Sequence, residues 1–330
     1  MTRADTLLDR EPLRYYPFET GRYDVSAGLT RLGEQRVHGR IESHVFAFDA
    51  TYERFLTAKI EARPKLHFFY QQAALSPMLR RAVLAAMLPR LAEDAREFVS
   101  WNGETLRNDL LGWSATLNLD EGSIGALTRF PARFSASVAN VEPLDALDFL
   151  ALNVSEDFSI VARSNDTGED WLAALHVCAP QHWDPREKIG RSFGPVHAPV
   201  GGSAALIATA PRLVHALTHK GPFARFAWGL ATSDRLEHHP ATRDHEDRSE
   251  RPFDPESTFV RVERQTLTPF PDERGAFFTI RPYLYALREV AADADRRARL
   301  AAALRSMTAE HLAYKGMTSW RDEVAAWLET

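Results

Sequence analysis

The strongest constraint on the fold is a pair of alternating segments near the carboxyl end of the chain. Residues 258–267 read TFVRVERQTL, and residues 275–287 read GAFFTIRPYLYAL. Apolar and polar residues alternate in both segments, which is typical of strands that bury one face. The intervening TPFPDER (268–274) is rich in turn residues. We therefore expect a β-hairpin and, with it, an antiparallel sheet.

Further strands and helices are expected around this hairpin. Strands over 157–164 and 171–179 flank the turn sequence NDTGED, and 224–233 is another candidate. Helical spacing of apolar residues predicts helices over 49–63, 77–98, 142–154, 210–221 and 288–311. The pattern favours an α+β fold in one domain over 1–330, with a mostly helical part (1–140) and a sheet-rich core (141–330) that ends in a helix.

The composition narrows the class of function. A net charge of −5 does not indicate a general nucleic-acid-binding surface. The single cysteine, Cys178, permits neither an internal disulfide nor a cysteine-rich zinc site, and its apolar context predicts a buried thiol. No window resembles a membrane span or a signal peptide, so we expect a cytoplasmic protein. The patterns GxGxxG and GxxxxGKS/T are absent from the sequence, so it does not support nucleotide binding through those loops.

The terminal hairpin carries polar residues at alternate positions of both strands. We expect one shared polar face that includes Arg261, Glu263, Gln265, Thr279, Arg281 and Tyr283. One interpretation is a solvated sheet face, which is common in antiparallel sheets. The other is a pocket lined by arginines, which suits carboxylates or an anionic cofactor because arginine offers a fixed fork of donors.

Two other groups of residues could carry chemistry. Glu156 and Asp157 lie where a helix meets an apolar strand, so we expect only one carboxylate to face the interior. That carboxylate is either part of an ordinary ion pair or an anion that holds a cationic substrate. His238, His239 and His245 cluster in a charged loop, where an exposed loop is a simpler interpretation than a metal site.

His197 lies in a segment that we expect to have no regular structure. Pro195 and Pro199 flank it and restrict the backbone, and Gly201 and Gly202 follow. A histidine fixed in this way is either a structural loop residue or a residue held in place for a ligand. The residues alone leave both alternatives open.

Four segments of the chain resemble one known family. They are EPLDALDFLALNVSEDFSIV (142–161), VCAPQHWDPREKIGRSFGPVHAPVGG (177–202), FVRVERQTLTPFPDERGAFFTIRPYLYAL (259–287) and HLAYKGM (311–317). They occur in this order in the alpha-subunit-like proteins of the haem-dependent oxidative N-demethylases. The resemblance covers roughly residues 15–325 and is strongest from residue 142 onward. Ser155, Gly201 and Ala227 depart from the family pattern, which has Gln, Pro and Asn there.

The resemblance implies a fold and an activity. The fold is a PAS-like core, a curved antiparallel sheet with helices beside it, that holds haem b. The activity is a monooxygenase reaction that activates O2 and removes a methyl group from a small secondary amine such as dimethylamine, which releases formaldehyde. Electrons come from NADPH and flavin through a reductase partner. The alternative is a PAS-type haem or ligand sensor, or a haem-binding subunit without catalysis.

The resemblance also implies roles for single residues. VHAPVG matches the family segment that carries the iron ligand, so His197 is the expected axial ligand. Candidate partners of the haem propionates are Lys188, Arg225, Arg261 and Arg281. Expected catalytic residues are Glu156 or Asp157, which would hold the protonated amine, and Tyr283.

Overall fold

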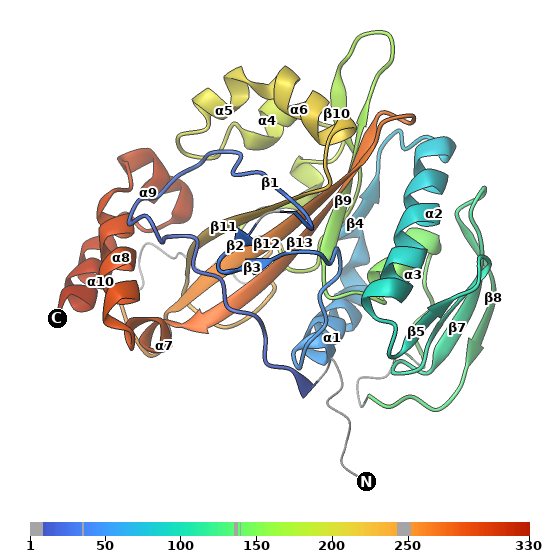
Figure 1. Ribbon diagram of the computed structural model, residues 1–330, viewed down its shortest axis with the longest axis horizontal. Coiled ribbons are helices and arrows are strands. Elements are labelled where there is room, and N and C mark those ends of the chain that lie inside the picture. Colours follow the sequence, from blue (N-terminus) through green and yellow to red (C-terminus); the bar gives the residue numbers. More distant parts are fainter. Residues whose placement is uncertain (1–8, 35, 135–137, 139, 243–251) are drawn as a thin grey trace.

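The protein is built on a long antiparallel sheet with helices on both sides (Figure 1). The structure, a computed structural model, describes residues 9–34, 36–134, 138, 140–242 and 252–330. The seven strands of this sheet lie in the order β1 (Thr30–Arg31), β11 (Phe223–Ala231), β12 (Phe259–Phe270), β13 (Gly275–Ala286), β9 (Asp157–Arg163), β10 (Asp170–His176) and β4 (Tyr70–Gln72). Every neighbouring pair is antiparallel. The predicted α+β class with an antiparallel sheet is therefore confirmed.

Four of the five predicted helices are present, with different boundaries. The helices of the first two thirds of the chain are α1 (Tyr52–Ala62), the 3₁₀ helix η2 (Arg63–Phe68), α2 (Pro77–Asp94), α3 (Ala146–Ala151), the 3₁₀ helix η3 (Pro185–Glu187), α4 (Phe193–His197), α5 (Ala204–Ala208) and α6 (Ala210–His219). α3 is shorter than predicted because Asp145 caps its first turn, and Pro143 lies before it.

The single helix predicted over 288–311 is wrong. The chain there forms α7 (Leu287–Ala291), α8 (Ala294–Arg305) and α9 (Ala309–Lys315), and α10 (Arg321–Glu329) follows. Asp293 accepts a hydrogen bond from the backbone of Arg296 and starts a new helix. Thr308 and His311 form a capping box that starts another. Local caps thus divide a stretch whose apolar spacing alone is continuous.

The prediction that residues 1–140 are mostly helical is also wrong. α1 and α2 are confirmed, but a separate four-stranded antiparallel sheet follows them. Its strands are β5 (Val99–Trp101), β6 (Thr105–Asn108), β7 (Trp113–Asn118) and β8 (Ser123–Arg129). A two-stranded ribbon of β2 (Arg36–Val37) and β3 (Arg40–Ile41) precedes α1.

The two faces of the long sheet have different partners. One face carries Phe158, Ile160 and Phe277, which pack into an apolar core with α1, α2 and the four-stranded sheet. Further along the same face, Trp228 and Val262 join a second core with α7, α8 and α10. α6 packs against the other face over β12, β13 and β9, beside α4 and α5 (Figure 1). We call this second face the α6 face; residues 225, 263 and 265 lie on it.

A buried polar group ties α3 to the sheet and to η2. Asp148, on α3, is fully buried and accepts hydrogen bonds from Arg63 at 2.7 Å and from the backbone of Leu144, and it contacts Nε2 of His176 at 3.0 Å. Burial alone would raise the pKa of Asp148, but His176, Arg63 and Leu144 lower it to about 2. His176 therefore has a structural role in this buried group.

Asp148 should make the fold sensitive to acid. Its pKa is lower in the folded protein than the ordinary value of 3.8, so its stabilisation is complete above about pH 4 and is lost as the pH falls towards 2. The shift corresponds to roughly 2–3 kcal/mol. Urea unfolding at pH 5 to 2 should show this loss in the wild type and not in Asp148→Asn, with exposed Asp120→Asn as control. Identical pH profiles for wild type and Asp148→Asn would contradict it.

None of the helices described is long and apolar enough to cross a bilayer.

Candidate functional site

His197 lies in a short helix, so the expected irregular segment is wrong. α4 ends at His197, and Pro195 falls in its first turn, where a missing N–H costs no intrahelical bond. Nδ1 of His197 lies 2.8 Å from the carbonyl oxygen of Phe193. The imidazole stacks on the Phe193 ring, with centroids 4.0 Å apart and an angle of 24°. Because a carbonyl only accepts, Nδ1 carries the proton and Nε2 keeps a lone pair.

The environment of His197 favours the neutral imidazole. Burial lowers the pKa of His197, and the nearby charges of Arg225 and Lys188 lower it further, although the Phe193 carbonyl opposes them. Nε2 makes no hydrogen bond within the described part of the chain. Three residues predicted to bind the cofactor, His197, Lys188 and Arg225, are therefore brought close together by the fold.

A row of polar side chains crosses the α6 face near His197. The register pairs Arg225 with Gln265 and Ala227 with Glu263. Glu263 is partly exposed at 21% and lies 3.7 Å from Nε of Arg261, and it accepts a hydrogen bond from Gln265 at 3.1 Å. Nε of Arg225 and Oε1 of Gln265 are buried without a hydrogen-bond partner among the described residues. Such groups are costly to bury, so they are candidates to contact a ligand.

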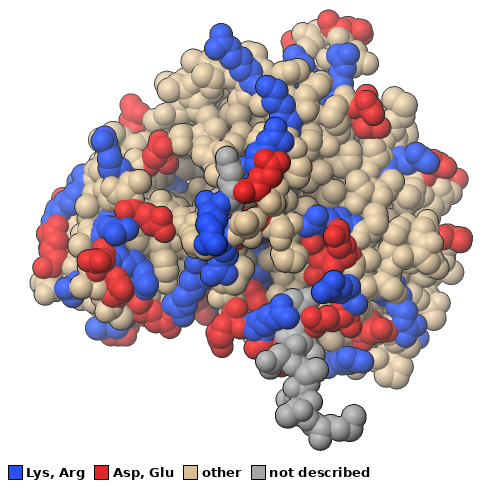
Figure 2. Space-filling view, in the orientation of Figure 1, with Lys and Arg blue, Asp and Glu red and all other residues tan. Residues whose placement is uncertain are grey.

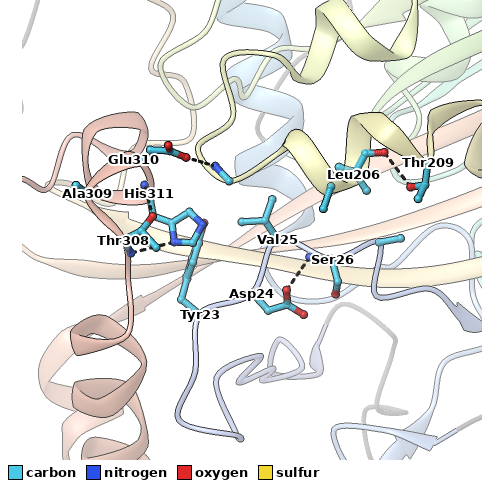
Figure 3. Close-up of a pocket in the computed structure, with 13 residues that line it drawn as sticks. Tyr23, Asp24, Val25, Ser26, Leu206, Thr209, Thr308, Ala309, Glu310 and His311 are labelled. Atoms are coloured by element: carbon cyan, nitrogen blue, oxygen red, sulfur yellow. Dashed lines mark hydrogen bonds between the residues drawn. The ribbon is translucent and has the colours of Figure 1, made fainter.

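A cleft of about 740 Å³ opens beside this row (Figure 3). Its walls come from residues 23–27, from α5 with Gly202 and Thr209, and from the start of α9. Arg225 connects the row to the cleft, because it donates to the backbone carbonyl of Ser26 at 3.4 Å. Burial raises the pKa of Tyr23, and the charges of Tyr314 and Glu263 add to the rise. The volume falls in the usual range of about 300–1,000 Å³ for cofactor and ligand sites.

A contact between distant segments, from Gly202 to Glu310, joins two walls of the cleft. In Figure 3 the carboxylate of Glu310 accepts from the backbone N–H of Gly202 at 3.3 Å, and Nδ1 of His311 accepts from the Thr308 N–H. A side chain at position 202 would collide with His311, because a Cβ there would lie 2.4 Å from Nε2. Glycine at 202 therefore permits α5 to approach α9. Gly202 is the one cleft residue that the sequence analysis singled out, as a glycine after His197; the rest of the lining was not predicted.

The shared polar face predicted for the hairpin is wrong. The structure pairs Arg261 with Leu284 and Val262 with Tyr283. Arg261, Glu263 and Gln265 thus lie on the α6 face, whereas Arg281 and Tyr283 lie on the opposite one. The turn has four residues, 271–274, rather than the seven expected. Gly275 pairs with Phe270 and not with Leu267, so the register is shifted by three residues, and an odd shift exchanges the faces.

Arg281 and Tyr283 belong to a buried network with the amino-terminal part of the chain. Arg281 donates to the Tyr283 hydroxyl at 2.9 Å and to Thr51 at 3.0 Å, and it pairs with Asp49 at 2.8 Å. Tyr283 lines a cavity of about 120 Å³ on this side, smaller than the usual ligand site. The roles predicted for Arg281 and Tyr283 stay predictions, and their contacts place them away from His197.

Arg261 and Lys188 already have protein acceptors. Arg261 is fully buried and donates to the carbonyls of Ala179 at 2.7 Å and Leu236 at 3.2 Å. Lys188 donates to the carbonyl of Val196 at 2.9 Å. The Nε atoms of Arg225, Arg261 and Arg281 all lack an acceptor in the described structure, and of these three arginines it is Arg225 whose charge acts on His197.

Glu156 and Asp157 are both buried, so the expectation that only one faces the interior is wrong. Asp157 accepts from the backbone N–H groups of Cys178 at 2.9 Å and Ala179 at 2.7 Å. Glu156 accepts from Ala47 at 2.8 Å, and its second oxygen has no partner among described residues. Burial raises the pKa of both carboxyls. Their catalytic role stays a prediction.

The histidine-rich loop is not simply exposed. His238 and His239 are buried, and Nε2 of His239 lies 3.2 Å from Asp184. His245 lies outside the described residues. Cys178 is buried, as predicted.

The residues around His197 fit haem better than a bare metal ion. Over the described ranges, no group of three or more His, Cys, Asp or Glu side chains is placed to hold an ion. Haem needs only one protein ligand, because the porphyrin supplies four nitrogens, and such a histidine normally donates its other ring nitrogen to a carbonyl or carboxylate. His197 has this arrangement, with Nδ1 on Phe193 and Nε2 available.

Comparison with known protein families agrees with this fit. A family described as "Haem-dependent oxidative N-demethylase, alpha subunit-like" matches residues 41–325, which is most of the 330-residue chain. The match includes α4, the polar row and the start of α9. The protein therefore belongs to the haem-dependent oxidative N-demethylase alpha-subunit-like family.

Proposed function

We propose that the protein is a haem-dependent monooxygenase that demethylates a small secondary amine. In this proposal haem b is held by Nε2 of His197 in a single PAS-like domain formed by the long sheet and α4–α6. The observation that carries the proposal is the anchored imidazole, with Nδ1 bonded to Phe193 and Nε2 without a partner in the described structure. Arg225, whose Nε lacks an acceptor there, is the proposed partner of a haem propionate.

The proposed reaction is balanced for a dimethylamine-like substrate. Dimethylamine, O2, two electrons and two protons give methylamine, formaldehyde and water: one C–N bond breaks, and the departing carbon is oxidised. Haem supplies the site of O2 activation when it is bound. The electrons come from NADPH through flavin in a partner protein, consistent with the words "alpha subunit" in the family description.

We propose Glu263 as the carboxylate that holds the protonated amine. A secondary amine is cationic at pH 7, and a buried cation needs an anion nearby. Asp157 is less suitable, since its two oxygens accept from backbone N–H groups. Glu263 keeps 21% of its side chain exposed and lies near both Arg225 and Tyr23.

Turnover tests the proposed function. The haem-loaded protein with a flavin reductase, NADPH and dimethylamine should form one formaldehyde for each NADPH and each O2 consumed. Trimethylamine and methylamine in parallel reactions define the substrate class. If haem binds but no N-methyl amine is turned over with either an enzymatic or a chemical reductant, the protein is a haem-binding sensor or non-catalytic subunit.

Glu263→Gln should weaken amine binding by about 1.5–3 kcal/mol, the usual value of a hydrogen bond to a charged group. The amine-induced change in the haem absorption spectrum measures this affinity. Haem content should stay unchanged because Glu263 does not contact His197. Asp157→Asn and Glu156→Gln are the matched variants. A loss of affinity in either of these variants, with none in Glu263→Gln, would assign the binding of the protonated amine to Glu156 or Asp157 instead.

A further inference from the structure

The amino-terminal end of α4 is capped by a residue from a different element. Ser192 precedes the helix, but its side chain makes no capping hydrogen bond. Instead, the carboxylate of Asp170, the first residue of β10, accepts from the backbone N–H of Phe193 at 2.7 Å. Phe193 is also the residue whose carbonyl contacts Nδ1 of His197 and whose ring stacks on the imidazole.

The other end of α4 is held by a cation. Lys188 donates from Nζ to the carbonyl of Val196, the residue directly before His197. The segment between Lys188 and α4 is itself attached to β10: Gly190 N–H donates to the Leu172 carbonyl, and Leu172 N–H donates to the Arg191 carbonyl, both at 2.9 Å. β10 therefore fixes the positions of both Lys188 and Asp170.

The signs of the two charges suit the helix. A carboxylate at the amino end and an ammonium at the carboxyl end both stabilise the backbone dipole. A helix of five residues is too short to persist on its own, because nucleation is unfavourable. α4 thus depends on contacts outside itself for its geometry, and the position of the Phe193 carbonyl depends on Asp170.

We infer that Asp170 and Lys188 are positioning residues that fix the tautomer and orientation of the His197 imidazole. The inference rests on the proposed function for its biological purpose, since a fixed Nε2 lone pair serves an iron ligand. The positioning of the imidazole itself does not depend on bound haem. Without Asp170, the Phe193 carbonyl is released, and His197 loses the bond that keeps the proton on Nδ1.

The first test uses haem-free protein labelled with ¹⁵N at histidine. In the wild type, the ring-nitrogen shifts of His197, assigned by comparison with His197→Ala, should report a proton on Nδ1. Asp170→Ala should move them towards the Nε2–H tautomer that free histidine prefers. Asp170→Asn should restore wild-type shifts, because Asn accepts at a helix start as well as Asp does. Glu169→Gln removes a neighbouring exposed carboxylate and should change nothing.

The second test uses haem-loaded protein. Asp170→Ala and Lys188→Met should each release haem to apomyoglobin about fivefold faster than wild type, the size expected for a lost cap. Lys220→Met, at the exposed end of α6, is the control for lost positive charge. If Asp170→Ala fails to fold, both the ¹⁵N shifts and the rate of haem release are measured in Lys188→Met, which alters the other end of the helix.

The outcomes separate this inference from the proposed function. If the wild-type protein binds no haem, the proposed function is removed. The ¹⁵N shifts still decide whether Asp170 and Lys188 position the His197 imidazole. Folded Asp170→Ala or Lys188→Met with wild-type ring shifts overturns the inference, even when haem binds. If Glu169→Gln changes the ring shifts as much as Asp170→Ala does, the inference is also overturned, because the change is then a general effect of charge.

Discussion

Replacing Lys59 with Met should lower the free energy of unfolding by about 3–5 kcal/mol, the usual cost of breaking a buried charged network. Lys59 lies on α1 with 2% of its surface exposed. Its ammonium group donates to the carbonyls of Ala151 at 2.8 Å, Val154 at 2.8 Å and Glu156 at 2.6 Å. Burial lowers the pKa of Lys59, and Asp157 is the main charge that opposes this. The methionine would leave three buried acceptors unpaired.

Urea unfolding at pH 7 measures this loss. Lys65→Met, at an exposed position of η2, is the matched control and should change the unfolding free energy by less than about 0.5 kcal/mol. Lys59 fixes the segment that leads into β9, so the variant should also lose cooperativity of unfolding. A loss below 1 kcal/mol for Lys59→Met would show that the carbonyls find other partners and that the ammonium group is dispensable.

Replacing His197 with Ala should weaken hemin binding by more than about 100-fold. Loss of residues that only orient a metal ligand typically costs 10–100-fold in affinity, and His197 is the proposed ligand itself. Phe193 would keep its place through Asp170, so α4 should persist without the imidazole. Titration of haem-free protein with hemin, followed at the Soret band, measures the affinity.

His215→Ala is the control for this variant, because His215 is an exposed histidine on α6. It should bind hemin as the wild type does. Equal affinity for hemin in His197→Ala and wild type would show that another residue holds the iron. Urea unfolding of haem-free His197→Ala should resemble that of the wild type, so a failure to bind reports the ligand and not the fold.

The sheet core was predictable because its signals are local. Alternation and turn residues predict β9, β10, β11, β12 and β13 close to where they lie. What failed was the hairpin register. Pro269 and Phe270 continue the strand, with Pro269 paired to Ala276, so the turn is shorter than its proline content suggests. The register decides whether Arg281 and Tyr283 lie on the same face of the sheet as Arg261, and composition does not determine the register.

The four-stranded sheet was missed although its turns are visible in the sequence. Asn102–Gly103 follows β5, and Glu121–Gly122 follows β7. Both glycines have a positive φ, at 97° and 67°, which is the conformation that such turns require. Counting these turn signals against the short apolar runs beside them would have indicated strands rather than more helix.

The candidate site was only partly predictable. His197 was singled out because prolines and glycines mark its segment, and its role as an iron ligand was implied by the family resemblance and stays a prediction. The short helix around it was not, since its cap comes from Asp170, more than twenty residues earlier. The cleft brings together Tyr23, Gly202 and His311 from segments far apart in the sequence. Figure 2 shows basic and acidic side chains interspersed over the face of the molecule that it displays.

The account's central claim is that the imidazole of His197 binds haem iron through Nε2. The resonance Raman spectrum of the ferrous haem-loaded protein tests it most directly, because an iron–histidine stretching band reports that bond. We predict the band in wild type, its shift on ¹⁵N labelling of histidine, its loss in His197→Gly and its return when imidazole is added to that variant. An unchanged band in His197→Gly without imidazole, or no such band in wild type, would contradict the account.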